Sequence, residues 1–122
     1  MKYADPTTQL VVEVPVRDLK ASLDFYRDLG FDVVRENADF AVLAWEGHQL
    51  FLVHQSDLQP LAFGHANVRV MVPDVDRRWE AARAKGLRVL VPIDDRDYGL
   101  RDFTLADPDG FGVRFGTWLH DL

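Results

Sequence analysis

The sequence repeats itself, and this repeat constrains the fold more than any other feature. Residues 12–34 align without a gap on residues 68–90 at a shift of 56, so that three alternating valines coincide with three others. Residues 39–52 align on residues 102–115 at a shift of 63. The difference of seven residues predicts an insertion near 94–100. The chain therefore consists of two similar modules.

Each module is predicted to fold as β-α-β-β-β. Valines at 12, 14 and 16 alternate with other residues, which is the period of a strand with one buried face. Asp18 suits a helix N-cap and Gly30 a helix end, and Asp74 and Gly86 repeat this pattern. Glycines in the turns 46–47 and 107–110 predict hairpins. The further strands are expected at about 31–36, 39–45, 48–54, 87–92, 101–106 and 111–117.

Length and composition favour one folded domain. The chain has 122 residues, of which 48% are hydrophobic, and domains most often contain about 100–150 residues. We expect module one at about 8–54, a linker at 55–64, module two at about 65–117 and a C-terminal tail at 118–122. The chain has no cysteine, which excludes disulfides, thiolate metal sites and a cysteine nucleophile.

The charge balance indicates which partners to expect. Fourteen Lys and Arg residues against twenty Asp and Glu residues give a net charge of -6. This charge argues against binding to nucleic acid or to an anionic membrane surface. No apolar stretch approaches the roughly 18 residues of a membrane span, and residues 1–15 do not resemble a signal peptide. We therefore expect a soluble cytoplasmic protein.

Two segments carry a resemblance to a known family. VRDLKASLDFYRDLGF (16–31) and ADPDGFGVRF (106–115), within the duplicated βαβββ pattern, resemble the vicinal oxygen chelate superfamily of glyoxalases, extradiol dioxygenases and bleomycin-resistance proteins. The resemblance covers about residues 9–117. It implies an α+β fold in which two βαβββ modules form a curved mixed sheet with the helices on the convex side.

The resemblance also indicates where a metal would bind. In metal-dependent members, four strand residues hold one divalent cation, and their positions here are Val11, Phe51, Asn67 and Arg114. Valine and phenylalanine cannot donate to a metal, an arginine repels one, and Asn67 would be a weak neutral ligand. A register shifted by two residues would bring His65 into the site, and we reject it. We therefore expect neither a metal nor a cofactor, and no catalytic residues.

The residues expected on the concave face suggest a binding site instead. Alternation from Leu50 and Leu52 turns Phe51 into the cavity, and the repeat register adds Trp45 while burying Phe40 and Val42. Tyr98, in the insertion, can fold over the mouth. The polar candidates are Glu13, Asn67, Arg69, Asp102 and Arg114. Aromatic rings with a few fixed polar groups suit a planar organic ligand.

The residues leave several alternatives open. Phe51 could fill the core or a dimer seam, Trp45 could be a surface aromatic, and Tyr98 could pack only against its own loop. Glu13 and Arg114 could form a structural ion pair on paired strands. The acidic groups favour a cationic ligand, whereas Arg69 and Arg114 favour a carboxylate or carbonyl.

Within the superfamily, the resemblance is closest to the bleomycin-resistance proteins, which are metal-free dimers that sequester a cationic drug. It implies a binding protein for antibiotic resistance or metabolite sequestration, which holds a planar aromatic small molecule, with a cationic one among the candidates, in a groove associated with a homodimer. The alternative is a glyoxalase-like lyase or isomerase, or a dioxygenase, with a non-standard metal site.

Overall fold

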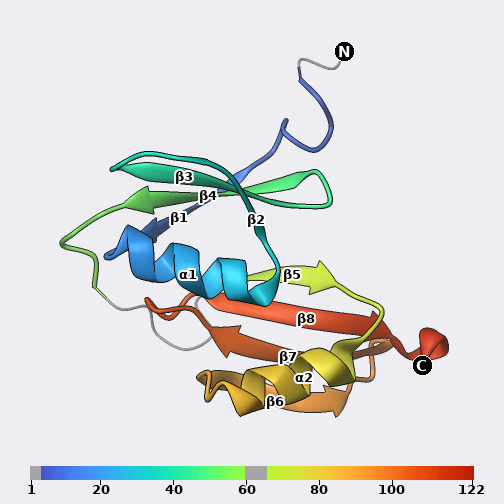
Figure 1. Ribbon diagram of the computed structural model, residues 1–122. Helices are drawn as coiled ribbons and strands as arrows, with labels where there is room; N and C mark the ends of the chain where they lie inside the picture. Colours follow the sequence, from blue (N-terminus) through green and yellow to red (C-terminus); the bar gives the residue numbers. More distant parts are fainter. Residues whose placement is uncertain (1–3, 60–65) are drawn as a thin grey trace. The chain divides into compact units, whose positions relative to one another are not determined.

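The computed structural model describes residues 4–59 and 66–122. The chain divides into two compact units, unit 1 (residues 1–60) and unit 2 (residues 61–122). Each unit contains one βαβββ module with a four-stranded mixed sheet and a helix, as the repeat predicts (Figure 1).

The two sheets have the same topology. Their strand orders are β1-β4-β3-β2 and β5-β8-β7-β6, with the first pair of each parallel and the others antiparallel. Unit 1 contains β1 (Val12–Val16), α1 (Leu19–Leu29), β2 (Asp32–Glu36), β3 (Phe40–Trp45) and β4 (His48–His54). Unit 2 contains β5 (Asn67–Met71), α2 (Val75–Ala84), β6 (Val89–Asp95), β7 (Leu100–Ala106), β8 (Gly112–Trp118) and a 3-10 turn (Leu119–Asp121).

The helix ends follow the sequence signals with one difference. The Asp18 carboxylate accepts a hydrogen bond from the Ala21 amide at 3.1 Å, and Gly30 ends α1 in the left-handed region with φ 110°. Asp74 precedes α2, but its side chain makes no capping hydrogen bond. It accepts from Arg78 Nε at 2.9 Å instead. The position of the second helix start was therefore predicted correctly and the role of Asp74 was not.

Each helix covers one face of its own sheet. Helix α1 packs against β2, β3 and β4, and α2 packs against β7 and β8. The apolar side chains on these helix-facing sides are fully or almost fully buried, among them Val14, Val16, Leu50, Leu52, Phe103, Leu105, Val113 and Phe115. None of the helices in the described ranges has the length and apolar character needed to cross a membrane.

The strand pairing refines the repeat. Val12 pairs with Leu50 and Val68 pairs with Val113, as the shifts of 56 and 63 require. In the third strand, however, Val42 pairs with Phe51 while Thr104 pairs with Arg114, so β3 matches β7 at a shift of 62. The turn after β7 thus holds one of the seven additional residues, and the β6–β7 hairpin holds the other six.

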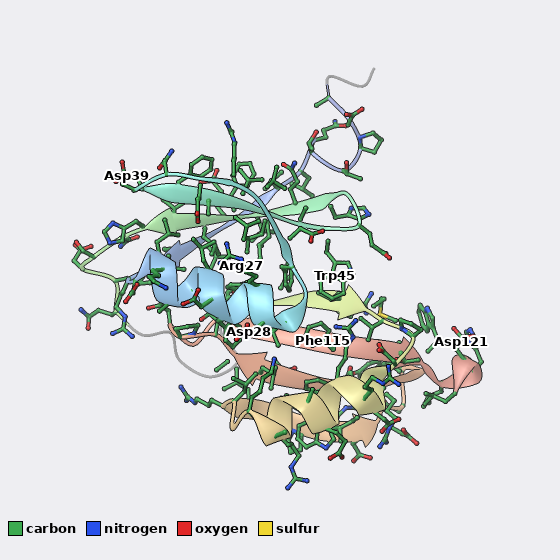
Figure 2. The ribbon with its side chains drawn as sticks, in the orientation of Figure 1. Arg27, Asp28, Asp39, Trp45, Phe115 and Asp121 are labelled. Carbon is green, nitrogen blue, oxygen red and sulfur yellow. The ribbon has the colours of Figure 1, made fainter. Side chains whose placement is uncertain are left out.

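This single residue reverses the predicted faces of β3. Ala41 and Leu43 are completely buried on the α1 side, and Trp45 also lies there, with its ring edge-to-face on Phe31 at 5.0 Å (Figure 2). Phe40 instead shares the opposite face with Phe51, at 5.5 Å between ring centroids. The prediction that Trp45 lies on the same face as Phe51 is wrong.

Candidate ligand-binding site

Five of the predicted site residues gather on one face of unit 2. Residues that pair directly across a sheet point to the same face, and neighbours along a strand point to opposite faces. Phe103 and Leu105 face α2, so Asp102 and Thr104 lie on the other face of the sheet. The residues paired with them extend this face across β8 and β5, where they include Arg114, Arg69 and Asn67.

The carboxylate of Asp102 is the centre of the site. Its side chain is only 3% exposed. One oxygen, Oδ1, accepts from Arg96 Nε at 2.8 Å. The other, Oδ2, accepts from the Tyr98 hydroxyl at 2.7 Å and from Arg114 Nε and Nη2 at 2.9 and 2.6 Å. A buried charge is tolerated because it is paired and hydrogen-bonded.

These contacts fix the protonation states. Burial alone would raise the pKa of Asp102, but the hydrogen bonds from Arg96, Tyr98 and Arg114 together lower it below its ordinary value. Burial and the Asp102 carboxylate raise the pKa of Tyr98. At neutral pH the network therefore contains a carboxylate, two guanidinium groups and a neutral phenol.

The insertion supplies two members of this network. The turn between β6 and β7 is closed by the Arg96 amide, which donates to the Leu100 carbonyl at 2.7 Å, and by Gly99 with φ 94°. This turn holds the Tyr98 ring, 53% exposed, with Arg114 Cζ 5.2 Å from its centroid. Sequence analysis selected Tyr98 and missed Arg96, although Arg96 lies in the same insertion.

Two adjoining pockets surround the network and share Tyr98 and Arg114. The first, of about 360 Å³, has an aromatic and cationic lining of Arg69, Tyr98, Leu100, Arg114 and Trp118. The second, of about 280 Å³, has a more polar lining of Asn67, Val91, Arg96, Tyr98, Asp102, Thr104 and Arg114.

Trp118 is a further aromatic residue that sequence analysis did not select. It is 44% exposed, and its ring stacks on the His120 ring at 5.9 Å with an angle of 7° between planes. Simple alternation along β8 from Arg114 through Gly116 reaches Trp118, so a period-two count could have identified it.

The remaining three predicted residues belong to unit 1. Glu13 pairs with Phe51 across β1 and β4, so these two share a face, and Trp45 lies on the opposite face. The expectation that Glu13 and Arg114 lie on paired strands is wrong. Strand β1 pairs with β4, and β8 pairs with β5 and β7.

The positions expected for metal ligands have the wrong donors. Arg114 carries a positive charge, and its guanidinium is already bound to Asp102. Phe51 offers only a ring, and Val11 offers no donor at all. Within residues 4–59 and 66–122, no group of three or more His, Asp or Glu side chains is arranged to hold a metal ion. His65 lies outside the described residues.

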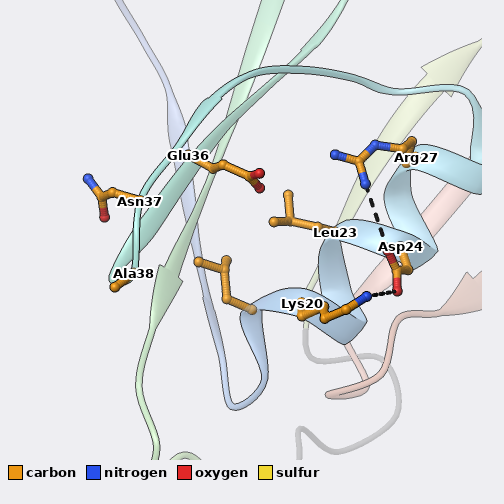
Figure 3. Close-up of a pocket in the computed structure, with 8 residues that line it drawn as sticks. Lys20, Leu23, Asp24, Arg27, Glu36, Asn37 and Ala38 are labelled. Atoms are coloured by element: carbon orange, nitrogen blue, oxygen red, sulfur yellow. Dashed lines mark hydrogen bonds and ion pairs between the residues drawn. The ribbon is translucent and has the colours of Figure 1, made fainter.

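Unit 1 has a pocket of about 430 Å³ between α1 and the β2–β3 hairpin (Figure 3). Among its charged side chains, Asp24 forms ion pairs with Lys20 at 3.0 Å and with Arg27 at 3.7 Å. All three side chains are more than half exposed. Exposed pairs of this kind are well solvated and contribute little to stability.

The duplicated βαβββ fold, with a polar and aromatic pocket beside its sheet, defines the class of protein. Residues 8–115 match the model of the Glyoxalase/Bleomycin resistance protein/Dioxygenase superfamily. The chain belongs to this superfamily. A comparison with curated proteins gives no significant match.

Solved structures share the fold. A bleomycin-binding protein complexed with bleomycin is 23% identical with a TM-score of 0.73, and the match covers 89% of this chain and 97% of that one. A bleomycin resistance determinant encoded on transposon Tn5 is 23% identical with a TM-score of 0.74, over 89% and 96%. TioX from Micromonospora sp. ML1 is 27% identical with a TM-score of 0.72, over 92% and 99%.

Proposed function

We propose that this protein binds a planar aromatic small molecule without transforming it, and that the site is the pair of pockets around Tyr98 and Arg114. The observation that carries this proposal is the fixed network of Arg96, Tyr98, Asp102 and Arg114 beneath those pockets. Such a network orients its side chains before a ligand arrives, which reduces the entropy cost of binding.

Two partly exposed rings support the aromatic part of the proposal. Tyr98 and Trp118 both line the larger pocket, with 53% and 44% of their surfaces exposed. Large exposed aromatic surfaces beside fixed polar groups are typical of ligand sites. A flat ligand would cover the rings, and each such contact contributes about 0.5–1.5 kcal/mol beyond area burial.

The state of Asp102 favours binding over catalysis. A general base must be able to accept a proton at the working pH. Asp102 has a lowered pKa, and both of its oxygens accept hydrogen bonds from neighbouring side chains. Its carboxylate therefore serves to hold Arg96, Tyr98 and Arg114 in position.

The relatives support a binding role in this superfamily, because one solved neighbour is a bleomycin-binding protein complexed with bleomycin. In our proposal, the groove is associated with a homodimer, and Phe51 and Glu13, which share one face of the sheet of unit 1, are ligand-binding residues of that unit. Phe51 stands beside Phe40 on its sheet face, which gives unit 1 an aromatic surface of its own.

A thermal-shift screen tests the proposal. The parent protein is heated with bleomycin and with a panel of flat aromatic natural products, since a ligand of the folded state raises the melting temperature. Tyr98→Ala and Trp118→Ala should each weaken binding roughly two- to twelvefold, the equivalent of one stacking contact. Phe25→Ala removes a ring from α1 and should leave affinity unchanged. The proposal fails if the double variant Tyr98→Ala, Trp118→Ala remains folded and binds as tightly as the parent.

A further inference from the structure

The charges that line the two pockets of unit 2 do not balance. Three guanidinium groups, those of Arg69, Arg96 and Arg114, accompany the single carboxylate of Asp102. Asp94, which pairs with Asp102 across β6 and β7, adds a negative charge that acts on Arg96. The remaining imbalance lies at Arg69 and Arg114, on the other side of the network.

Asp102 is already neutralised. Arg96 and Arg114 both bind it, and both have side chains that are only 22% exposed. The carboxylate itself is 3% exposed, so a ligand cation has little access to it. In the sequence, Asp102 favoured a cationic ligand. In the structure, its carboxylate is bound by the protein's own arginines instead.

Arg69 stands next to Arg114, and its side chain has no counter-ion among the residues that the structure describes. The two residues are direct partners in the parallel β5–β8 ladder, where neighbouring strands lie about 4.8 Å apart and paired side chains share a face. Arg69 is exposed, and its side chain forms no hydrogen bond or ion pair with any other residue in the described ranges. Two adjacent like charges repel, and an anion placed against both would remove this repulsion.

We infer that the ligand is a planar aromatic carboxylate, with its ring against Tyr98 and Trp118 and its charge against Arg69 and Arg114. This inference rests on the proposed binding function and specifies its ligand class. All four side chains line the same pocket. The planar guanidinium fork matches the geometry of a carboxylate, and charge-assisted hydrogen bonds are about twice as strong as neutral ones.

Three naphthalene probes of similar size and different charge test this inference. They are 2-naphthoate, 2-naphthamide and 2-naphthylmethylammonium, titrated by calorimetry and by the NMR signal of the Trp118 indole. We expect 2-naphthoate to bind about tenfold more tightly than the amide, and the ammonium to bind most weakly. Arg69→Gln should remove most of the preference for 2-naphthoate and leave the affinity for the amide within about twofold.

Two variants serve as controls. Arg77→Gln removes an equal charge from an exposed position on α2, on the opposite side of the sheet, and should change neither affinity. Arg69→Lys retains the charge and should retain part of the preference for 2-naphthoate. Since Arg69 is exposed, circular dichroism should show all three variants folded.

The outcomes separate the inference from the function on which it rests. If the amide or the ammonium binds at least as tightly as 2-naphthoate, and Tyr98→Ala weakens that binding, the site binds planar molecules and the anionic class is wrong. If none of the three probes binds or shifts the Trp118 signal, the binding function is wrong and the inference fails with it. Loss of the 2-naphthoate preference in Arg77→Gln would also overturn the role of Arg69.

Discussion

Arg114 donates two hydrogen bonds to a single carboxylate oxygen of Asp102, at 2.9 and 2.6 Å, across the two central strands of unit 2. Asp102 is paired with Gly116 and Arg114 with Thr104, so the contact is diagonal in the ladder. Because Gly116 carries no side chain, the Asp102 carboxylate meets none from its direct partner on β8 and bonds to Arg114 instead.

Asp102→Asn should destabilise the fold by about 1.5–3 kcal/mol, the usual range for a hydrogen bond to a charged group. The substitution leaves Arg96 and Arg114 close together, each with a side chain only 22% exposed and without its carboxylate. Urea unfolding measures the change. Asp76→Asn is the matched control, because Asp76 is 58% exposed and binds Arg101 at the surface. An effect of Asp102→Asn no larger than that of Asp76→Asn would contradict the prediction.

The contribution of Asp102 to stability should depend on pH. Its folded pKa lies below the unfolded value of about 3.9, so its ionised form stabilises the folded state above about pH 4. This stabilisation is lost as the pH falls through the lower, folded pKa. The difference in unfolding free energy between the parent and Asp102→Asn should therefore shrink from neutral pH toward about pH 2. A difference that stays constant over this range would show that the carboxylate is not stabilised by the network.

The fold could be predicted almost completely from the sequence, because the two modules repeat a strong pattern. The alternating valines of β1 and the helix signals at Asp18 and Gly30 lie where the structure has them. These signals are local, since they depend on neighbouring residues along one element. They can therefore be interpreted correctly without any knowledge of tertiary contacts.

The faces of β3 could not be predicted in the same way. Successive residues of a strand point to opposite faces of the sheet. One additional residue in the turn after β7 therefore exchanges the two faces for every β3 residue that is assigned by alignment with β7. Phe40 matches Asp102 in the structure, whereas a gapless alignment matches it with Phe103. The network was hard to predict for a related reason, since Arg96 reaches Asp102 only through the shape of its turn.

Gly112→Ala should destabilise unit 2, whereas Gly116→Ala should be tolerated. A Cβ on Gly112 would lie 2.7 Å from Asn67 Cβ, which is closer than such atoms pack, and only 3.0 Å from the Ala66 carbonyl oxygen. Overpacking of this kind costs about 1–3 kcal/mol. On Gly116 the nearest atom is Asp102 Cβ at 3.4 Å, an ordinary contact. Thermal unfolding of the two variants compares them directly, and equal losses would contradict the close approach of β5 and β8.

Trp45→Ala should reduce stability without changing ligand affinity. Trp45 is half-buried beside Phe31 in unit 1, so its loss should cost about 2 kcal/mol, less than the 3–5 kcal/mol of a fully buried ring. Trp118→Ala is the converse case, because that ring is 44% exposed and lines the proposed site. It should weaken binding with little loss of stability. If Trp45→Ala stays folded and its ligand affinity falls, Trp45 belongs to the binding site and this prediction is wrong.

The protein should form a symmetric homodimer. In each unit, the helix covers one face of the sheet and leaves the face with Phe40 and Phe51, or with Tyr98 and Arg114, without a helix of its own. Two-fold association is the commonest way in which soluble proteins bury such surfaces. Sedimentation equilibrium should therefore give twice the chain mass of 14.0 kDa at micromolar concentration. A single species with the mass of one chain over the whole concentration range would contradict the dimer.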